Sequence, residues 1–267
     1  REYTDSQTYL TVTQEAQKSR LFSFDGRKWR DFLVKIRKVQ DQLKDAGVRA
    51  EFLTKEDASE YIDRYFAMDF THKTLSMNNF KVDEECVRMG DRKCKIFSLV
   101  DVDSINLPSL VRPFANIEVN NTQMPVDVMA AIDQIPEART VVYNQMIFIP
   151  NQKRELALLE KKKNRHASIP NPGNQMAVED IKQVQEVMAR EGKQLVYTHY
   201  NLVVCCDSDA DLQKPTNHLE NTFGRMGVHI SKRAYNQLEL FVNSFPGNCY
   251  GMSAEYDRFL TLGDAAA

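Results

Sequence analysis

The chain has 267 residues, of which 42% are hydrophobic and 27% are charged, and its net charge is −2. This balance is typical of a globular protein of one large or two small domains. It excludes two classes of protein: disordered chains, and proteins whose overall positive charge draws them to nucleic acid or lipid.

Cysteine usage and hydropathy indicate the compartment. Five cysteines without a CxxC pair argue against a disulfide framework and favour a reducing, cytoplasmic setting. The sequence has no apolar run close to the roughly 20 residues that cross a bilayer. Because residue 1 is Arg, we expect a piece excised from a longer protein.

The N-terminal third predicts strands followed by helices. β-Branched and aromatic residues favour strands at 8–13 and 21–24. Apolar side chains spaced by three and four predict an amphipathic helix over 27–46 and a second helix over 55–68. The apolar stripe of the first helix consists of Trp29, Phe32, Leu33, Ile36, Val39 and Leu43.

The segment that follows predicts a hairpin and then an irregular crossover. Residues 80–87 and 94–102 are strand-like and flank Gly90, which favours a turn. Prolines and asparagines between 103 and 125 predict irregular structure. We therefore expect a subdomain boundary in this crossover, at residue 110.

The second half alternates helices and strands. The run 140–149 is nearly continuous in apolar residues, which predicts a central strand buried on both faces. Asn151 and Gly192 are expected to cap helices, and Pro215 fits the first turn of a helix. The remaining predicted elements are helices at 126–135, 151–163, 176–190 and 212–226, a loop at 168–174, and strands at 195–206 and 228–231.

These elements predict an α+β fold with mixed sheets and packed helices, whose second half resembles a ferredoxin-like split βαβ sandwich. We expect an N-terminal α+β subdomain at 1–110, a second one at 111–248, and a connector at 249–267.

The end of the chain contains the feature that points to function. A helix with apolar Tyr235, Leu238, Phe241 and Val242 must stop at Phe245-Pro246-Gly247-Asn248, because Pro246 lacks an amide hydrogen and Gly247 accepts positive φ. The tail from Tyr250 to Leu262 reads as a connector without a core element of its own.

This C-terminal run resembles the conjugation ATPases of type IV secretion systems, specifically the TraG type of conjugative transposons. The residues that carry the resemblance are 243–248, 253–262, 139–145 and 151–159, within a longer similarity from Leu195 to Leu262. In that family, a proline-glycine turn closes the N-terminal domain and the nucleotide-binding domain follows. The resemblance implies that Phe245, Pro246, Gly247 and Asn248 form an interdomain hinge and contact.

The chain lacks the phosphate-binding loop GxxxxGK[ST], because none of its ten glycines is followed five positions later by Gly-Lys. We therefore predict no catalytic, cofactor or metal residue here, and expect ATP and Mg²⁺ only in a missing ATPase domain. The resemblance implies a scaffold, cytoplasmic and peripheral to the inner membrane. Its implied partners are its own ATPase domain, other secretion subunits and further copies of itself, with direct DNA contact left open.

Two other patterns have structural explanations. Asp207, Asp209 and Asp211 alternate as in a calcium loop, but Leu212 and His218 stand where that loop needs Gly and Glu, so we interpret them as acids at a helix N-terminus. A metal site made of His199, Cys205 and Cys206 is disfavoured, because neighbouring side chains of a strand point to opposite faces.

One basic cluster leaves alternatives open. Its residues are Lys153, Arg154, Lys161, Lys162, Lys163, Arg165 and His166. It is interpreted as the solvated face and last turn of a helix, or as a contact surface for nucleic acid, lipid or an acidic partner. The rival functions are thus a nucleic-acid-binding module and a stand-alone α+β enzyme, which would have a deep pocket lined by acids or bases.

Overall fold

The structure is a computed structural model that describes residues 7–14, 26–71, 80–99, 114–117, 122–125, 132, 135–169, 171–225, 228–231, 236–253 and 257–263. Its contacts form two compact units. The N-terminal unit is Arg1–Met77 with Phe245–Tyr250, and the sheet unit is Asn78–Ser244 with Gly251–Ala267. The boundary expected at residue 110 lies outside the described residues.

The N-terminal unit contains the two predicted helices, α1 (Gly26–Asp45) and α2 (Lys55–Ala67). Helix α2 begins with a capping box, in which the Thr54 hydroxyl accepts from the Asp57 amide and the Asp57 carboxylate accepts from the Thr54 amide, both at 3.1 Å. The helix ends at Met68, which adopts a left-handed conformation with φ +46°.

The strand predicted at 8–13 is wrong, because residues 7–14 form no strand. This segment packs through side chains instead: the ring of Tyr9 lies 4.5 Å from that of Tyr61 in α2. A β-rich sequence forms a strand only where it finds a ladder partner, and no partner strand is seen for it in the described part of the chain. The strand predicted at 21–24 lies outside the described residues.

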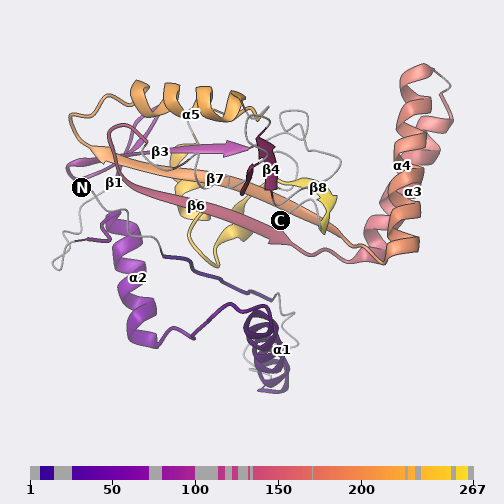
Figure 1. Cartoon of the computed structure of the whole chain (residues 1–267), viewed down its shortest axis with the longest axis horizontal. Helices are drawn as coiled ribbons and strands as arrows, with labels where there is room; N and C mark the ends of the chain where they lie inside the picture. Colours follow the sequence, from indigo (N-terminus) through magenta and orange to yellow (C-terminus); the bar gives the residue numbers. More distant parts are fainter. Residues whose placement is uncertain are drawn as a thin grey trace. The chain divides into compact units, whose positions relative to one another are not determined.

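The sheet unit is built on one antiparallel sheet with the order β1-β2-β3-β7-β6, and β8 also pairs with β7 (Figure 1). The strands are β1 (Phe80–Val82), β2 (Val87–Met89), β3 (Arg92–Leu99), β6 (Ala138–Phe148), β7 (Leu195–Asp207) and β8 (Phe259–Leu262). The α+β class is confirmed, whereas the described pairings are antiparallel throughout rather than mixed. Two helices connect β6 to β7 and return the chain to the end it left, so the two strands run in opposite directions.

The central strand is β7, not the run at 140–149 that the sequence favoured. Strand β7 pairs with β6 along one edge and with β3 and β8 along the other, and most of its side chains are buried. Strand β6 is the last strand of the sheet order, and Ile147 on it is 51% exposed. Both runs are apolar, so only the pairing decides which one is central.

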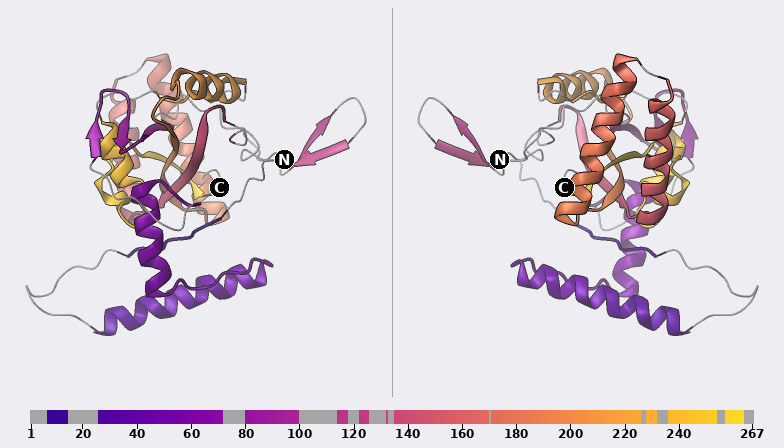
Figure 2. Two further views of the ribbon diagram at one scale, coloured as in Figure 1. Left: turned by 90° about the vertical axis from the view of Figure 1, so that its left-hand side faces the viewer. Right: turned by 90° about the vertical axis from the view of Figure 1, so that its right-hand side faces the viewer.

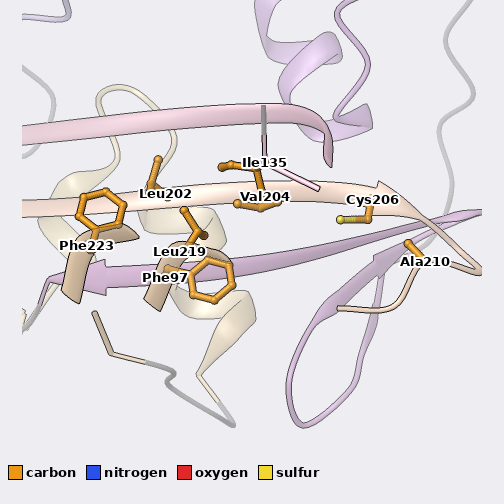
Figure 3. Packing of buried hydrophobic residues seen from close by; sticks show 8 residues of the cluster. All are labelled: Phe97, Ile135, Leu202, Val204, Cys206, Ala210, Leu219 and Phe223. Carbon is orange, nitrogen blue, oxygen red and sulfur yellow. The ribbon is translucent and has the colours of Figure 1, made fainter. Parts of the chain in front are cut away.

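Helix α5 (Gln213–Arg225) covers one face of the sheet (Figure 1), and Figure 3 shows the buried side chains that lie on this face. Leu219 and Phe223 of this helix pack against Phe97 of β3 and Val204 of β7. The buried cluster on this face comprises Phe97, Ile135, Leu202, Val204, Cys206, Ala210, Leu219 and Phe223. Pro215 lies in the first turn of α5, as predicted.

The predicted split βαβ connection is present, but the described segment that returns after α5 forms isolated bridges rather than a continuous strand. After α5, Ser231 forms an isolated antiparallel bridge with Ser98 of β3, and the Ser231 amide donates to the Ser98 carbonyl at 2.8 Å. Strand β7 is also antiparallel to β3. The segment at Ser231 therefore runs in the same direction as β7, with β3 between them.

Antiparallel hairpins occupy the described middle of the chain, and the first of them divides the strand predicted at 80–87 into β1 and β2. Gly90, with φ +61°, forms the predicted turn between β2 and β3. The irregular crossover expected at 103–125 is wrong in part, because β4 (Phe114–Ile117) and β5 (Thr122–Pro125) form a two-stranded sheet. Most of the helix predicted at 126–135 lies outside the described residues.

Helices α3 (Gln152–Ala167) and α4 (Pro172–Glu191) lie side by side as an antiparallel pair (Figures 1 and 2). Asn151 caps α3 by accepting from the Arg154 amide at 3.2 Å, and Gly192 ends α4 with φ +67°, both as predicted. The loop between them is shorter than expected, because Asn171 caps α4 and Pro172 starts it. In the described part of the chain, every helix is too short or too polar to span a membrane.

Candidate functional site: the C-terminal junction

The C-terminal junction, which we define as residues 237–263, begins with helix α6 (Gln237–Asn243). The fully buried side chain of Gln237 holds this helix on β3. Its Oε1 accepts from the Ile96 amide at 2.7 Å, and its Nε2 donates to the Ile96 carbonyl at 3.1 Å. One amide side chain thus satisfies both main-chain groups of a strand residue, as a neighbouring strand would.

The predicted stop after this helix is confirmed. Helix α6 ends at Asn243, and the Asn248 amide donates to the Phe245 carbonyl at 2.9 Å across the turn. Gly247 has φ +86°, a conformation that L side chains rarely adopt. Gly247 and Asn248 form the exposed tip of the turn.

Phe245 packs into an aromatic cluster of the N-terminal unit. Its ring stacks on Phe66 with centroids 5.4 Å apart, and it lies 5.2 Å from Tyr65 and 6.2 Å from Tyr61. We define the aromatic cluster as Tyr9, Tyr61, Tyr65, Phe66, Phe70 and Phe245. Burial raises the pKa of Tyr61 to about 12, with a smaller contribution from Tyr9.

The tail after the turn was expected to lack a core element, and this is wrong. A 3₁₀ turn at Cys249–Gly251 leads to β8, which pairs with residues 195–198 of β7. Met252 and Phe259 are buried. The four-residue strand is too short to stand out in the sequence, and its place was available because β3 leaves this end of β7 unpaired.

A buried polar chain ties the tail and α6 to β7. His199 Nδ1 lies 2.6 Å from the Asp257 carbonyl, and its Nε2 lies 3.0 Å from the Asn201 amide nitrogen. Because a carbonyl only accepts, the proton belongs on Nδ1, and Nε2 accepts from Asn201. Asn201 also donates to Ser244 Oγ at 2.8 Å. Both ring nitrogens of His199 are therefore engaged by this chain.

The buried thiols behave as core residues. Cys206 belongs to the cluster beneath α5, and Cys205 pairs in register with Cys94 on β3. Burial raises the pKa of Cys206 to about 12, and burial with a hydrogen bond to Cys205 raises that of Cys94 well above its ordinary value. Such thiols remain protonated and are poor nucleophiles or metal ligands.

The alternating aspartates have separate local roles. The Asp207 carboxylate pairs with Arg139 Nη1 at 3.0 Å. Asp211 accepts from the Gln213 amide at 3.0 Å at the start of α5, where we expected acids. No group of three or more potential metal ligands occurs among the residues that the structure describes.

The basic residues singled out in the sequence all lie on α3, away in sequence from the junction. Arg154, Lys161, Lys162 and Arg165 are exposed on it, as is Lys153. Lys163 differs, because it pairs with Glu160 at 2.6 Å and donates to Gln185 of α4 at 3.1 Å. The bond from Lys163 lowers the pKa of Glu160, and a second bond, donated by Gln185 Nε2 to Glu160 at 3.0 Å, contributes less.

The N-terminal unit contains a cavity of about 310 Å³ lined in part by Asp57, Glu60, Tyr61 and Arg64. Three of its charged groups are already paired: Arg64 bonds Glu60 at 2.7 Å, and Asp57 belongs to the capping box. Hydrogen bonds from Thr54 lower the pKa of Asp57. The stand-alone enzyme stays an untested prediction.

Sequence reasoning found the turn at the junction but missed what it touches. Tyr61 and Tyr65, spaced by four in the helix predicted at 55–68, were a partial signal for the aromatic cluster. No local pattern marks Gln237, because a buried glutamine is recognised only by the strand it bonds.

The comparisons with known proteins agree with the type IV secretion resemblance. No curated protein matches the sequence. A family model described as TraC protein matches residues 34–249, from within α1 to just beyond the proline-glycine turn. The match therefore confirms the relation of this chain to conjugation and type IV secretion, whereas its assignment to the TraG type stays a prediction. This chain belongs to the TraC protein family.

Proposed function

We propose that this chain is the non-hydrolysing scaffold and docking region of a conjugation ATPase, as its resemblance to TraG-type enzymes implied. The observation that carries the proposal is the TraC family match over 34–249 in a sequence without a phosphate-binding loop. The catalytic domain, with ATP and Mg²⁺, would follow in the parent protein, which would lie at the periphery of the inner membrane.

The geometry of the C-terminal junction supports docking there. Phe245 is held by three rings of α2, while Gly247 and Asn248 remain exposed at the tip of the turn. An exposed tip on a base held by packed side chains is what a contact for a following domain requires.

Two measurements test this proposal. The purified chain should hydrolyse ATP no faster than a buffer control, and the parent reading frame beyond Ala267 should encode a Gly-Lys-Ser/Thr loop. The extended protein should hydrolyse ATP, and its Lys-to-Ala variant in that loop should not. Hydrolysis by the isolated chain would refute the non-catalytic role, and a parent frame without the loop would refute the ATPase assignment.

A local nucleic-acid contact on α3 is the second candidate. At about 100° per residue, Arg154, Lys161 and Arg165 share one helix face, so their charges can follow a phosphate backbone. The exposed Lys162 lies beside them. We therefore propose the contact at Arg154, Lys161, Lys162 and Arg165.

A salt-dependent DNA titration separates this candidate from a solvated helix face. Replacing Lys161 and Arg165 with Gln should weaken binding and reduce the salt slope by about two, because each phosphate contact contributes about one. Lys153→Gln, at a position about 100° around α3 from Arg154, provides the comparison. Equal affinity of the double variant and the wild type would eliminate the surface.

A further inference from the structure

The apolar face of helix α1 is exposed at Trp29 and Leu33 and half-buried at Phe32, Ile36, Val39 and Leu43. The helix is 20 residues long, about 30 Å, and has no buried residue. Trp29 is 51% exposed and Leu33 is 37% exposed, whereas α2 in the same unit buries Tyr65 completely. Figure 2 shows α1 as one uninterrupted helix.

Hydrogen bonds join two side chains of α1 to described segments that lie beside it. Lys35 donates to Gln14 at 3.1 Å, and Gln40 donates to the Ala50 carbonyl at 3.0 Å. The apolar stripe of α1 spans roughly 120° of its circumference at about 100° per residue. Such a stripe normally faces a core or another surface.

The charges of α1 are sorted around this stripe. The helix carries seven basic and three acidic residues, a net charge of +4 in a chain whose net charge is −2. Lys28 and Lys35 line one edge of the stripe, and the other edge is lined by Arg30, Arg37 and Lys44. The three acids, Asp31, Asp41 and Asp45, lie toward the opposite side of the helix.

This distribution fits an anionic bilayer better than a protein groove. Long basic side chains at both edges can extend to lipid phosphates while the apolar stripe enters the acyl boundary, and the acids stay farthest from the lipid. Trp29 suits the interfacial region, because its ring is apolar and its N–H is polar. A second α1 is disfavoured as the occupant, since any face-to-face pairing would bring basic edges together.

We infer that α1 is an interfacial helix that docks on an anionic membrane surface with its axis in the plane of the bilayer. The inference deepens the membrane-peripheral placement proposed above, but it depends on α1 alone. The positive charge of α1 attracts anionic lipid locally, so the net negative charge of the whole chain does not prevent this docking.

Trp29 provides the test, because it is the only tryptophan of the chain. Vesicles of phosphatidylglycerol and phosphatidylcholine in equal parts should shift its emission to shorter wavelengths and co-sediment with the protein. Vesicles of phosphatidylcholine alone should do so at least about tenfold more weakly, since each basic residue near an anionic surface contributes about 1 kcal/mol. Raising the salt to about 1 M should weaken binding to the anionic vesicles.

Two double variants with the same charge change form a matched pair. Lys35→Glu with Arg37→Glu reverses one cation on each edge, and it should weaken binding to anionic vesicles at least about tenfold. Arg27→Glu with Lys38→Glu reverses cations on the opposite side, and it should weaken binding much less. Far-UV circular dichroism checks that both variants keep their helicity.

Three outcomes would overturn the inference. The first is the absence of both an emission shift and co-sedimentation with anionic vesicles, and the second is an equal loss of binding in the two double variants. The third is a shift of Trp29 emission that follows protein concentration without lipid, which would identify a protein partner. None of these outcomes bears on the phosphate-binding loop of the parent protein, so the ATPase proposal is tested separately.

Discussion

Phe245 and Phe66 stack with their ring planes 22° apart and their centroids 5.4 Å apart. The contact joins the residue before the proline-glycine turn to a helix near the start of the chain. The turn is thus more than a helix stop, because it completes the apolar core of the N-terminal unit. Its sequence neighbour Ser244 belongs to the sheet unit, so the chain changes units at this peptide bond.

Replacing Phe245 with Ala should destabilise the N-terminal unit by about 2–3 kcal/mol. The change removes apolar contact with three rings and leaves a gap in the aromatic cluster. Hydrogen exchange should show faster exchange of the α2 amides, with β7 amides unchanged. Val242→Ala, at a 36% exposed position of α6, is the control and should leave α2 protection unaltered. If Phe245→Ala accelerated the exchange of β7 amides as much as that of α2 amides, the contribution of Phe245 would not be local to the N-terminal unit.

Replacing Gly247 with Ala should cost about 1–2 kcal/mol, because a Cβ is strained at positive φ. Steric contact adds little, since the nearest side-chain atom, Thr11 Cγ2, would lie 3.8 Å from that Cβ. Urea unfolding followed by circular dichroism measures the loss.

Replacing Gly224 with Ala should have the opposite effect on stability. It lies in α5, and a Cβ added there would have no neighbouring atom within 4 Å, so Gly224→Ala should stabilise the chain by up to about 1 kcal/mol. If both glycine variants moved the unfolding midpoint in the same direction, backbone strain at Gly247 would not be the cause.

The features predictable from the sequence are local ones. Asn151, Gly192 and Gly90 were identified because a cap or a turn depends on a few neighbouring residues. The position of β6 at the edge of the sheet was not predictable, since its apolar content resembles that of β7. Pairing partners distant in sequence decide which strand is central, and they also recruited Phe259 into the sheet.

The same limit applies to the junction. The helix stop at Pro246 and Gly247 follows from covalent geometry, and it was found. The contact of Phe245 with α2 depends on two segments meeting in space, and no spacing rule describes it.

Burial of Tyr143 and Cys206 should make the sheet unit sensitive to alkali. Burial raises the pKa of each group to about 12, from ordinary values of 10.0 and 9.0. Between these values the unfolded chain releases protons that the folded chain keeps, so stability is full below about pH 9 and falls as the pH rises toward 12. Each group contributes a slope of about 1.4 kcal/mol per pH unit within its own window.

Tyr143→Phe should flatten this decline above about pH 10, because phenylalanine has no proton to lose. Urea midpoints measured from about pH 8 to about pH 11 give the comparison. An unchanged slope in the variant would mean that Tyr143 does not titrate with unfolding.

Gln237 offers the sharpest test of the junction, because both of its polar atoms bond one residue, Ile96. Gln237→Leu should cost about 2–4 kcal/mol, since it leaves a buried amide and a buried carbonyl without partners. In Gln237→Glu, one oxygen still accepts from the Ile96 amide, but the other faces the Ile96 carbonyl and needs a proton. Its folded pKa should therefore lie above the ordinary value of about 4.3, so the deficit is largest at neutral pH and shrinks as the pH falls toward that value. The exposed Glu239→Gln is the control, and a deficit in Gln237→Glu that does not change with pH would contradict this pair of bonds.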